Sequence, residues 1–95
     1  MKDYNILILD DEAAQRDILT GYLKKKGYKI YSASSGKEGI EIIKNNPVDI
    51  ILSDFKMPDL NGIEVLEQVK KLNPEISFVI VTAYGTVENA VKAKM

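Results

Sequence analysis

The stretch ILILDDE, at residues 6–12, joins a run of four aliphatic residues to three acidic ones. Its four aliphatic residues would be apolar on both sides of an extended strand, which is typical of a central strand of a parallel sheet that is buried on both faces. We therefore predict a strand over residues 4–9. The acidic residues follow where this strand ends, and ligands of open parallel sheets bind outside the carboxyl ends of the strands.

Short apolar runs alternate with longer helical patterns along the rest of the chain, and this alternation predicts βαβ units in an α/β fold. Further strands are predicted at residues 28–33, 48–53 and 76–81. The first of these alternates more between apolar and polar residues, which places it nearer an edge of the sheet. The pattern of the last helix begins at Thr86 and still continues at Met95.

Signals for the starts and ends of the helices support this interpretation. Ser35 and Glu38 have the spacing of a capping box at the start of the second helix. The helices are expected to end at Gly27, at Asn45-Asn46-Pro47 and at Asn73-Pro74, because glycine and proline follow or interrupt helices in this way.

Length and composition narrow the class of protein. The 95 residues, 45% of them hydrophobic, fit one small domain over residues 1–95. The 13 basic and 14 acidic residues are scattered, which indicates neither a nucleic-acid surface nor a membrane surface and favours protein partners. The chain has no cysteine and no histidine, which excludes thiolate zinc sites and histidine-dependent triads. Without a leader or a spanning apolar run, we expect a cytoplasmic protein.

Acidic and hydroxyl groups follow three of the predicted strands. Asp10 and Asp11 follow the first, Asp54 follows the third and Thr82 follows the fourth. Crowded carboxylates repel unless a hard cation such as Mg²⁺ neutralises them through oxygen ligands, so a metal site is expected at this edge. Taken singly, the two aspartates after the first strand also suit a solvated helix N-terminus, Asp54 a turn, and Thr82 a strand end.

Three motifs carry a resemblance to a known family. They are ILILDDE at residues 6–12, ILSDFKMPDLNG at residues 51–62 and VIVTA at residues 79–83. Through them the chain resembles the receiver domain of bacterial response regulators over essentially its whole length. The resemblance implies a flavodoxin-like, doubly wound parallel sheet with strand order 2-1-3-4.

The resemblance also implies roles for individual residues. Asp54 would take a phosphoryl group from a sensor histidine kinase, as a phosphoacceptor that is later hydrolysed and not as a conventional enzyme. Mg²⁺ would be held by Asp11, Asp54 and the backbone carbonyl of Lys56, with Asp10 helping through water. Thr82 would donate its hydroxyl to the phosphoryl group and so switch a transcriptional output.

Residues 82–91, TAYGTVENAV, further resemble receivers of sigma-54-dependent activators of the nitrogen-regulatory-protein-C type, which continue into an ATPase and a DNA-binding module. The family's fifth strand, fifth helix and phosphate-contacting lysine are expected beyond Met95. Loss of one such charged donor slows a reaction by about 10²–10³, so we expect slow phosphorylation of this chain. The fourth strand would be an exposed edge, which predicts either self-association through it and the last helix or partial disorder after about Thr82.

Two other classes of protein remain open. A Mg²⁺-dependent phosphohydrolase of the dehalogenase-like class also uses an aspartate nucleophile on a parallel sheet. Its nucleophile follows the first strand in a D-x-D pattern, which Asp10-Asp11-Glu12 lacks. The third class is an interaction module that works without phosphorylation. Turnover of an aryl phosphate would favour the former, and failure to bind Mg²⁺ the latter.

Overall fold

The computed structural model describes residues 4–53, 59 and 62–80 of the chain. Its strands form one parallel sheet in the order β2-β1-β3-β4, which confirms the predicted fold class and the edge position of the second strand. The strands are β1 (Asn5–Leu9), β2 (Lys29–Ala33), β3 (Ile50–Ser53) and β4 (Ser77–Ile80). Each is slightly shorter than predicted. The predicted last helix lies outside the described residues.

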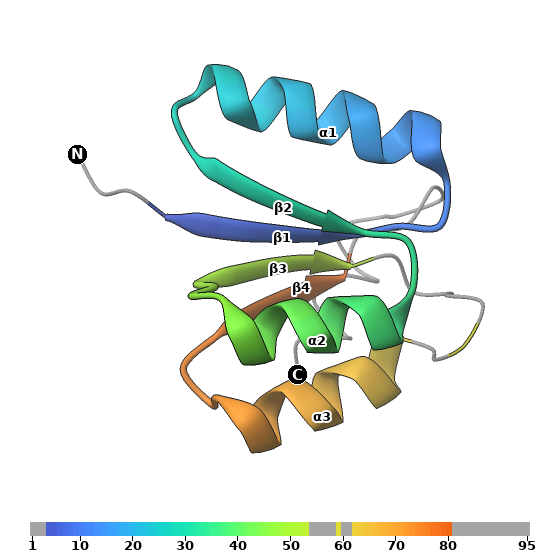
Figure 1. The fold of residues 1–95 in the computed structure, drawn as a ribbon, viewed down its shortest axis with the longest axis vertical. Coiled ribbons are helices and arrows are strands. Elements are labelled where there is room, and N and C mark those ends of the chain that lie inside the picture. Colours follow the sequence, from blue (N-terminus) through green and yellow to red (C-terminus); the bar gives the residue numbers. More distant parts are fainter. Residues whose placement is uncertain (1–3, 54–58, 60–61, 81–95) are drawn as a thin grey trace.

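The helices cover both faces of the sheet. They are α1 (Ala13–Lys25), α2 (Gly36–Asn45) and α3 (Gly62–Leu72). As Figure 1 shows, α1 lies on one face, while α2 and α3 lie side by side on the other. The helices end where the sequence predicts: Gly27 has the positive φ of 94° that favours glycine after a helix, and Asn46 is extended before Pro47.

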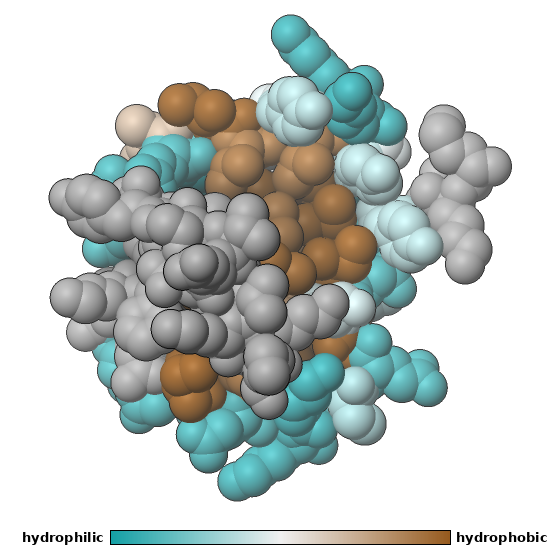
Figure 2. All heavy atoms as spheres, turned by 180° about the vertical axis from the view of Figure 1, so that it is seen from behind, coloured by the Kyte–Doolittle hydropathy of each residue, from teal (hydrophilic) through white to brown (hydrophobic). Residues whose placement is uncertain are grey.

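The α1 face of the sheet is buried over β1 and less covered over β3. Ile6 and Ile8 are buried, whereas their register partners Ile50 and Leu52 are half-buried. No residue of α1 is fully buried, and Ile18 on this helix is 71% exposed. The rear view shows hydrophobic residues gathered at the surface, bordered by hydrophilic ones (Figure 2). Part of the apolar pattern of the first helix therefore faces solvent.

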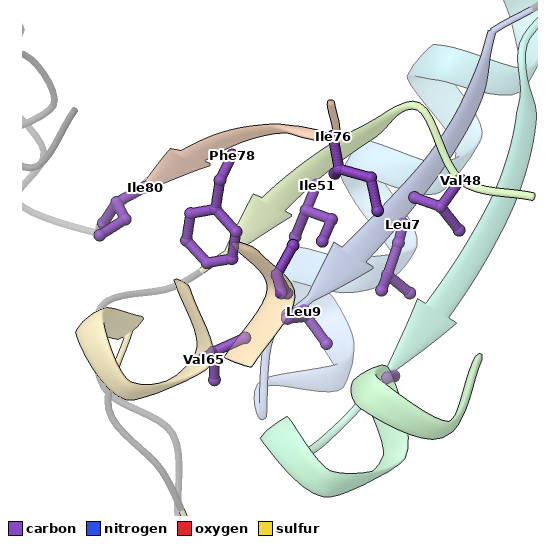
Figure 3. Packing of buried hydrophobic residues seen from close by; sticks show 10 residues of the cluster. Leu7, Leu9, Val48, Ile51, Val65, Ile76, Phe78 and Ile80 are labelled. Atoms are coloured by element: carbon purple, nitrogen blue, oxygen red, sulfur yellow. The ribbon is translucent and has the colours of Figure 1, made fainter. Parts of the chain in front are cut away.

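The main core lies between the sheet and the pair α2 and α3. Leu7, Leu9 and Ile51 point into it from the central strands, and Val65 packs from α3 near Phe78 of β4 (Figure 3). All but Phe78 are at most 1% exposed, so this layer is densely filled. Burial of such side chains stabilises the fold by about 1.5–3 kcal/mol each. The core thus fixes the positions of β1 and β3, whose ends carry the predicted site residues.

The start of α2 differs in one detail from the predicted capping box. The Ser35 Oγ accepts a hydrogen bond from the Glu38 amide at 3.2 Å, as expected. The Glu38 carboxylate, however, accepts from the amide of Ser34 at 2.7 Å, one residue before the position that a capping box requires.

Among the helices that the structure describes, none is both long and apolar enough to cross a membrane.

Candidate functional site

The carboxyl ends of β1, β3 and β4 lie side by side at one edge of the sheet. In the parallel register Leu9 pairs with Ser53, and Ser53 pairs with Ile80. Asp10 follows Leu9 directly in the chain, as Asp54 follows Ser53. Parallel pairing of the last strand residues therefore brings the chain segments that carry the predicted site to a common edge.

Asp10 is held firmly at this edge. Its side chain is buried, with 5% of the residue exposed. The carboxylate Oδ1 accepts a hydrogen bond from the Glu12 amide at 2.9 Å, and the Asp10 amide donates to the Ala33 carbonyl at 3.1 Å. Arg16 donates from Nη1 to the Asp10 carbonyl oxygen at 2.6 Å. Asp10 therefore shapes the turn between β1 and α1 and is not a solvated residue.

Asp11 lies in a different environment, although it is the next residue. It is exposed and has no hydrogen-bond partner within the part of the chain that the structure describes. Its carboxylate is thus available to a ligand from solution. Carboxylate oxygens are the donors that Mg²⁺ prefers, and Mg²⁺ typically keeps several waters when few protein ligands are present. The two acidic side chains at the end of β1 fit such an ion.

The remaining predicted site residues, Asp54, Lys56 and Thr82, lie outside the described residues. Within residues 4–53, 59 and 62–80, no three acidic, histidine or cysteine side chains cluster closely enough to bind a metal.

Two residues that the sequence did not single out contribute to this edge. Arg16 reaches back along α1 to the Asp10 carbonyl. Asp59, which lies between β3 and α3 in the sequence, accepts hydrogen bonds from the backbone amides of Gly36 and Lys37 at 2.9 and 3.0 Å. Only the spacing of six residues from Asp10 could have pointed to Arg16, whereas Asp59 reads in the sequence as a common turn residue.

Comparison with known proteins identifies the family. The profile of the response regulator receiver domain matches residues 6–95. The transcriptional regulatory protein ZraR of Escherichia coli is 38% identical over 89 residues, which are 94% of this chain and 20% of ZraR. Sporulation initiation phosphotransferase F of Bacillus subtilis is 33% identical over 94 residues, covering 99% of this chain and 76% of that protein. The chain thus spans about a fifth of the regulators of the ZraR type.

Solved structures agree with this identification. A CheY-like receiver domain from Methanospirillum hungatei has a TM-score of 0.85 at 35% identity, covering 98% of this chain and 77% of its own. The response regulator TrrA of Thermotoga maritima, in complex with Mg²⁺ and BeF, has a TM-score of 0.81 at 30% identity, covering 86% and 71%. These matches agree with the flavodoxin-like topology and not with the dehalogenase-like alternative. The chain belongs to the response regulator receiver domains of two-component systems.

Proposed function

We propose that this receiver domain is a phosphoacceptor, in which Asp54 takes a phosphoryl group from a sensor histidine kinase. The observation that carries the proposal is the pairing of Leu9 with Ser53 at the ends of β1 and β3. Asp10 directly follows Leu9 in the sequence, and Asp54 directly follows Ser53. Consecutive Cα atoms are only about 3.8 Å apart. This register supports a shared acidic site.

In the proposed chemistry a carboxylate of the chain is the nucleophile. An oxygen of Asp54 attacks the phosphorus of the kinase's phosphohistidine, a P–O bond forms, and the P–N bond breaks as the imidazole leaves with the electron pair. Water later attacks the acyl phosphate, which releases inorganic phosphate and restores the carboxylate. An ionised carboxylate is a competent nucleophile, and phosphoryl transfer depends mainly on positioning and charge stabilisation.

Asp11, Asp54 and the backbone carbonyl of Lys56 would hold Mg²⁺, with Asp10 acting through water. The ion would supply positive charge to the oxygens of the transferred group. The carboxylate of Asp11, which is exposed and has no partner among the described residues, supports a direct ligand role. The hydrogen-bonded Oδ1 of Asp10 supports an indirect one. The complex of TrrA with Mg²⁺ and BeF supports the choice of metal.

The output and the partners follow from the relatives. ZraR and GlrR are transcriptional regulatory proteins, which supports a transcriptional response. The hydroxyl of Thr82 would bind the phosphoryl group and convert the added charge into a change of shape. The scattered charges favour a kinase partner over direct contact of this domain with nucleic acid or membrane. We place this signalling in the cytoplasm.

Phosphorylation by acetyl phosphate with Mg²⁺, followed by intact-mass analysis, tests the proposal. We expect the mass of one phosphoryl group to be added to the wild-type chain and to Asp17→Asn, because Asp17 is exposed on α1 without a partner among the described residues. Asp54→Asn should not be labelled. Labelling that persists in Asp54→Asn would show that the acceptor is another residue, and Mg²⁺-independent labelling would contradict the role of the metal.

A further inference from the structure

The carboxylate of Asp59 links two segments that are far apart in the sequence. Its Oδ1 accepts from the Gly36 amide at 2.9 Å and its Oδ2 from the Lys37 amide at 3.0 Å. Both amides belong to the first turn of α2, whereas Asp59 belongs to the loop between β3 and α3. Both oxygens of one side chain are therefore engaged with the start of another helix.

Asp59 is exposed, but two features strengthen its hydrogen bonds to the start of α2. The first amides of a helix have no partner within the helix, and they carry the positive end of its dipole. Hydrogen bonds from such amides to a carboxylate are charge-assisted. The side chain of Ser35 accepts only from the Glu38 amide. Asp59, which is 22 and 23 residues away in the sequence, completes the cap of α2 by accepting from the Lys37 and Gly36 amides.

The start of α2 is a firm anchor for this link. Gly39 packs so closely on β1 that a Cβ atom at this position would overlap the side chain of Leu9. Ile40 is buried as well. Leu9 directly precedes Asp10, so Asp59 connects the loop after β3 to the same packed unit that carries the acidic end of β1.

We propose that Asp59 is a positioning residue for the phosphoacceptor loop, an inference that rests on the proposed function. Ser53 is fixed in β3 by its pairing with Leu9, and Asp59 is fixed on α2. Only five residues separate these two points, and they include Asp54 and Lys56. A short chain segment that is held at both ends has fewer conformations than one held at a single end. The two hydrogen bonds of Asp59 to α2, here called the Asp59 bridge, would thereby lower the entropy cost of positioning Asp54 and Lys56.

A series of variants at Asp59 tests the inference, with Glu38→Gln as a matched control. Asp59→Ala removes both acceptors, whereas Asp59→Asn keeps one oxygen and nearly the same volume. Glu38→Gln weakens another carboxylate contact at the start of α2, to Ser34, without involving the loop after β3. All variants are compared by Mg²⁺ titration calorimetry, by amide hydrogen exchange and by urea denaturation.

We expect Asp59→Ala to weaken Mg²⁺ affinity about tenfold, at the lower end of the effect of outer-shell partners of metal ligands. Asp59→Asn should give a smaller loss of Mg²⁺ affinity, and Glu38→Gln should bind Mg²⁺ as the wild type does. Faster exchange of the Gly36 and Lys37 amides in Asp59→Ala would confirm that the bridge exists in solution.

Each outcome bears on the inference. Unchanged Mg²⁺ affinity in Asp59→Ala, with faster exchange at Gly36, would mean that Asp59 only caps α2 and would overturn the positioning role alone. Equal losses in Asp59→Ala and Glu38→Gln would assign the effect to general loosening of α2 and also overturn it. A wild-type chain that binds no Mg²⁺ would overturn both the proposed function and this inference.

Discussion

Replacement of glycine by alanine at positions 21 and 39 makes the same chemical change in two helices, and we expect different effects on the free energy of unfolding. Gly21 lies within α1, and a Cβ atom there would have no other atom within 4 Å. Gly39 lies within α2, and a Cβ atom there would overlap the side chain of Leu9. Leu9 is only 1% exposed, so its side chain has little room to move.

Two opposing effects set the magnitudes. Alanine is more favourable than glycine inside a helix by about 1 kcal/mol, and this gain applies at both positions. Gly39→Ala also forces a methyl group into a packed core, which costs about 1–3 kcal/mol. Gly21→Ala should therefore be more stable than the wild type by up to about 1 kcal/mol. Gly39→Ala should be less stable than Gly21→Ala by about 1–3 kcal/mol.

Urea denaturation followed by far-ultraviolet circular dichroism measures both variants, since the free energy of unfolding falls linearly with denaturant. The comparison between the two variants cancels the helix preference and isolates the contact with Leu9. Equal denaturation midpoints with unchanged slopes would refute the reasoning. They would mean that α2 can move away from β1 without cost, and that it is not the firm anchor that the Asp59 bridge requires.

Three further predictions concern the acidic end of β1, the contact of Arg16 and the exposed edge strand β4. We expect Asp11→Asn to weaken Mg²⁺ affinity about tenfold or more, and Glu12→Gln much less; equal effects in calorimetry would indicate a diffuse acidic patch. Arg16→Met should lower the free energy of unfolding by about 1.5–3 kcal/mol, because it removes a charged donor from the Asp10 carbonyl; an unchanged thermal melt would speak against this. Within the described sheet β4 pairs only with β3, so we expect the chain to self-associate and Val79→Lys to reduce its mass in light scattering. A monodisperse wild-type monomer would contradict that expectation.

The strands and the sheet order could be predicted because their signals are local and redundant. Residues 6–9 are all aliphatic, and such a run suits a strand that is covered on both faces. The ends of α1 and α2 could be predicted for a similar reason: Gly27 and Pro47 act on the backbone itself, whatever surrounds them. Asp10 and Asp11 could be assigned to the sheet edge because every parallel strand ends there.

Contacts between distant segments could not be predicted. Ile18 has the helical spacing of a buried residue, yet it is exposed, because among the described strands α1 packs mainly on β1 and β2. Glu38 has capping-box spacing, yet its carboxylate bonds to Ser34, since the geometry of the preceding turn decides which amide is in reach. The partners of Asp59 lie 22 and 23 residues away, and no local pattern encodes them.

Asp10 and Asp11 are neighbours at the end of β1, yet the fold gives them different environments. Asp10 is buried, and its carboxylate and backbone groups bond to Glu12, Ala33 and Arg16. A carboxylate that already accepts a hydrogen bond in this way keeps its position but is less able to bind a metal ion directly. Asp11 has the opposite properties, since it is exposed and unpaired among the described residues. Because Asp10 fixes the turn, the exposed carboxylate of Asp11 starts from a defined backbone position. Preorganisation by the first aspartate therefore favours metal binding by the second.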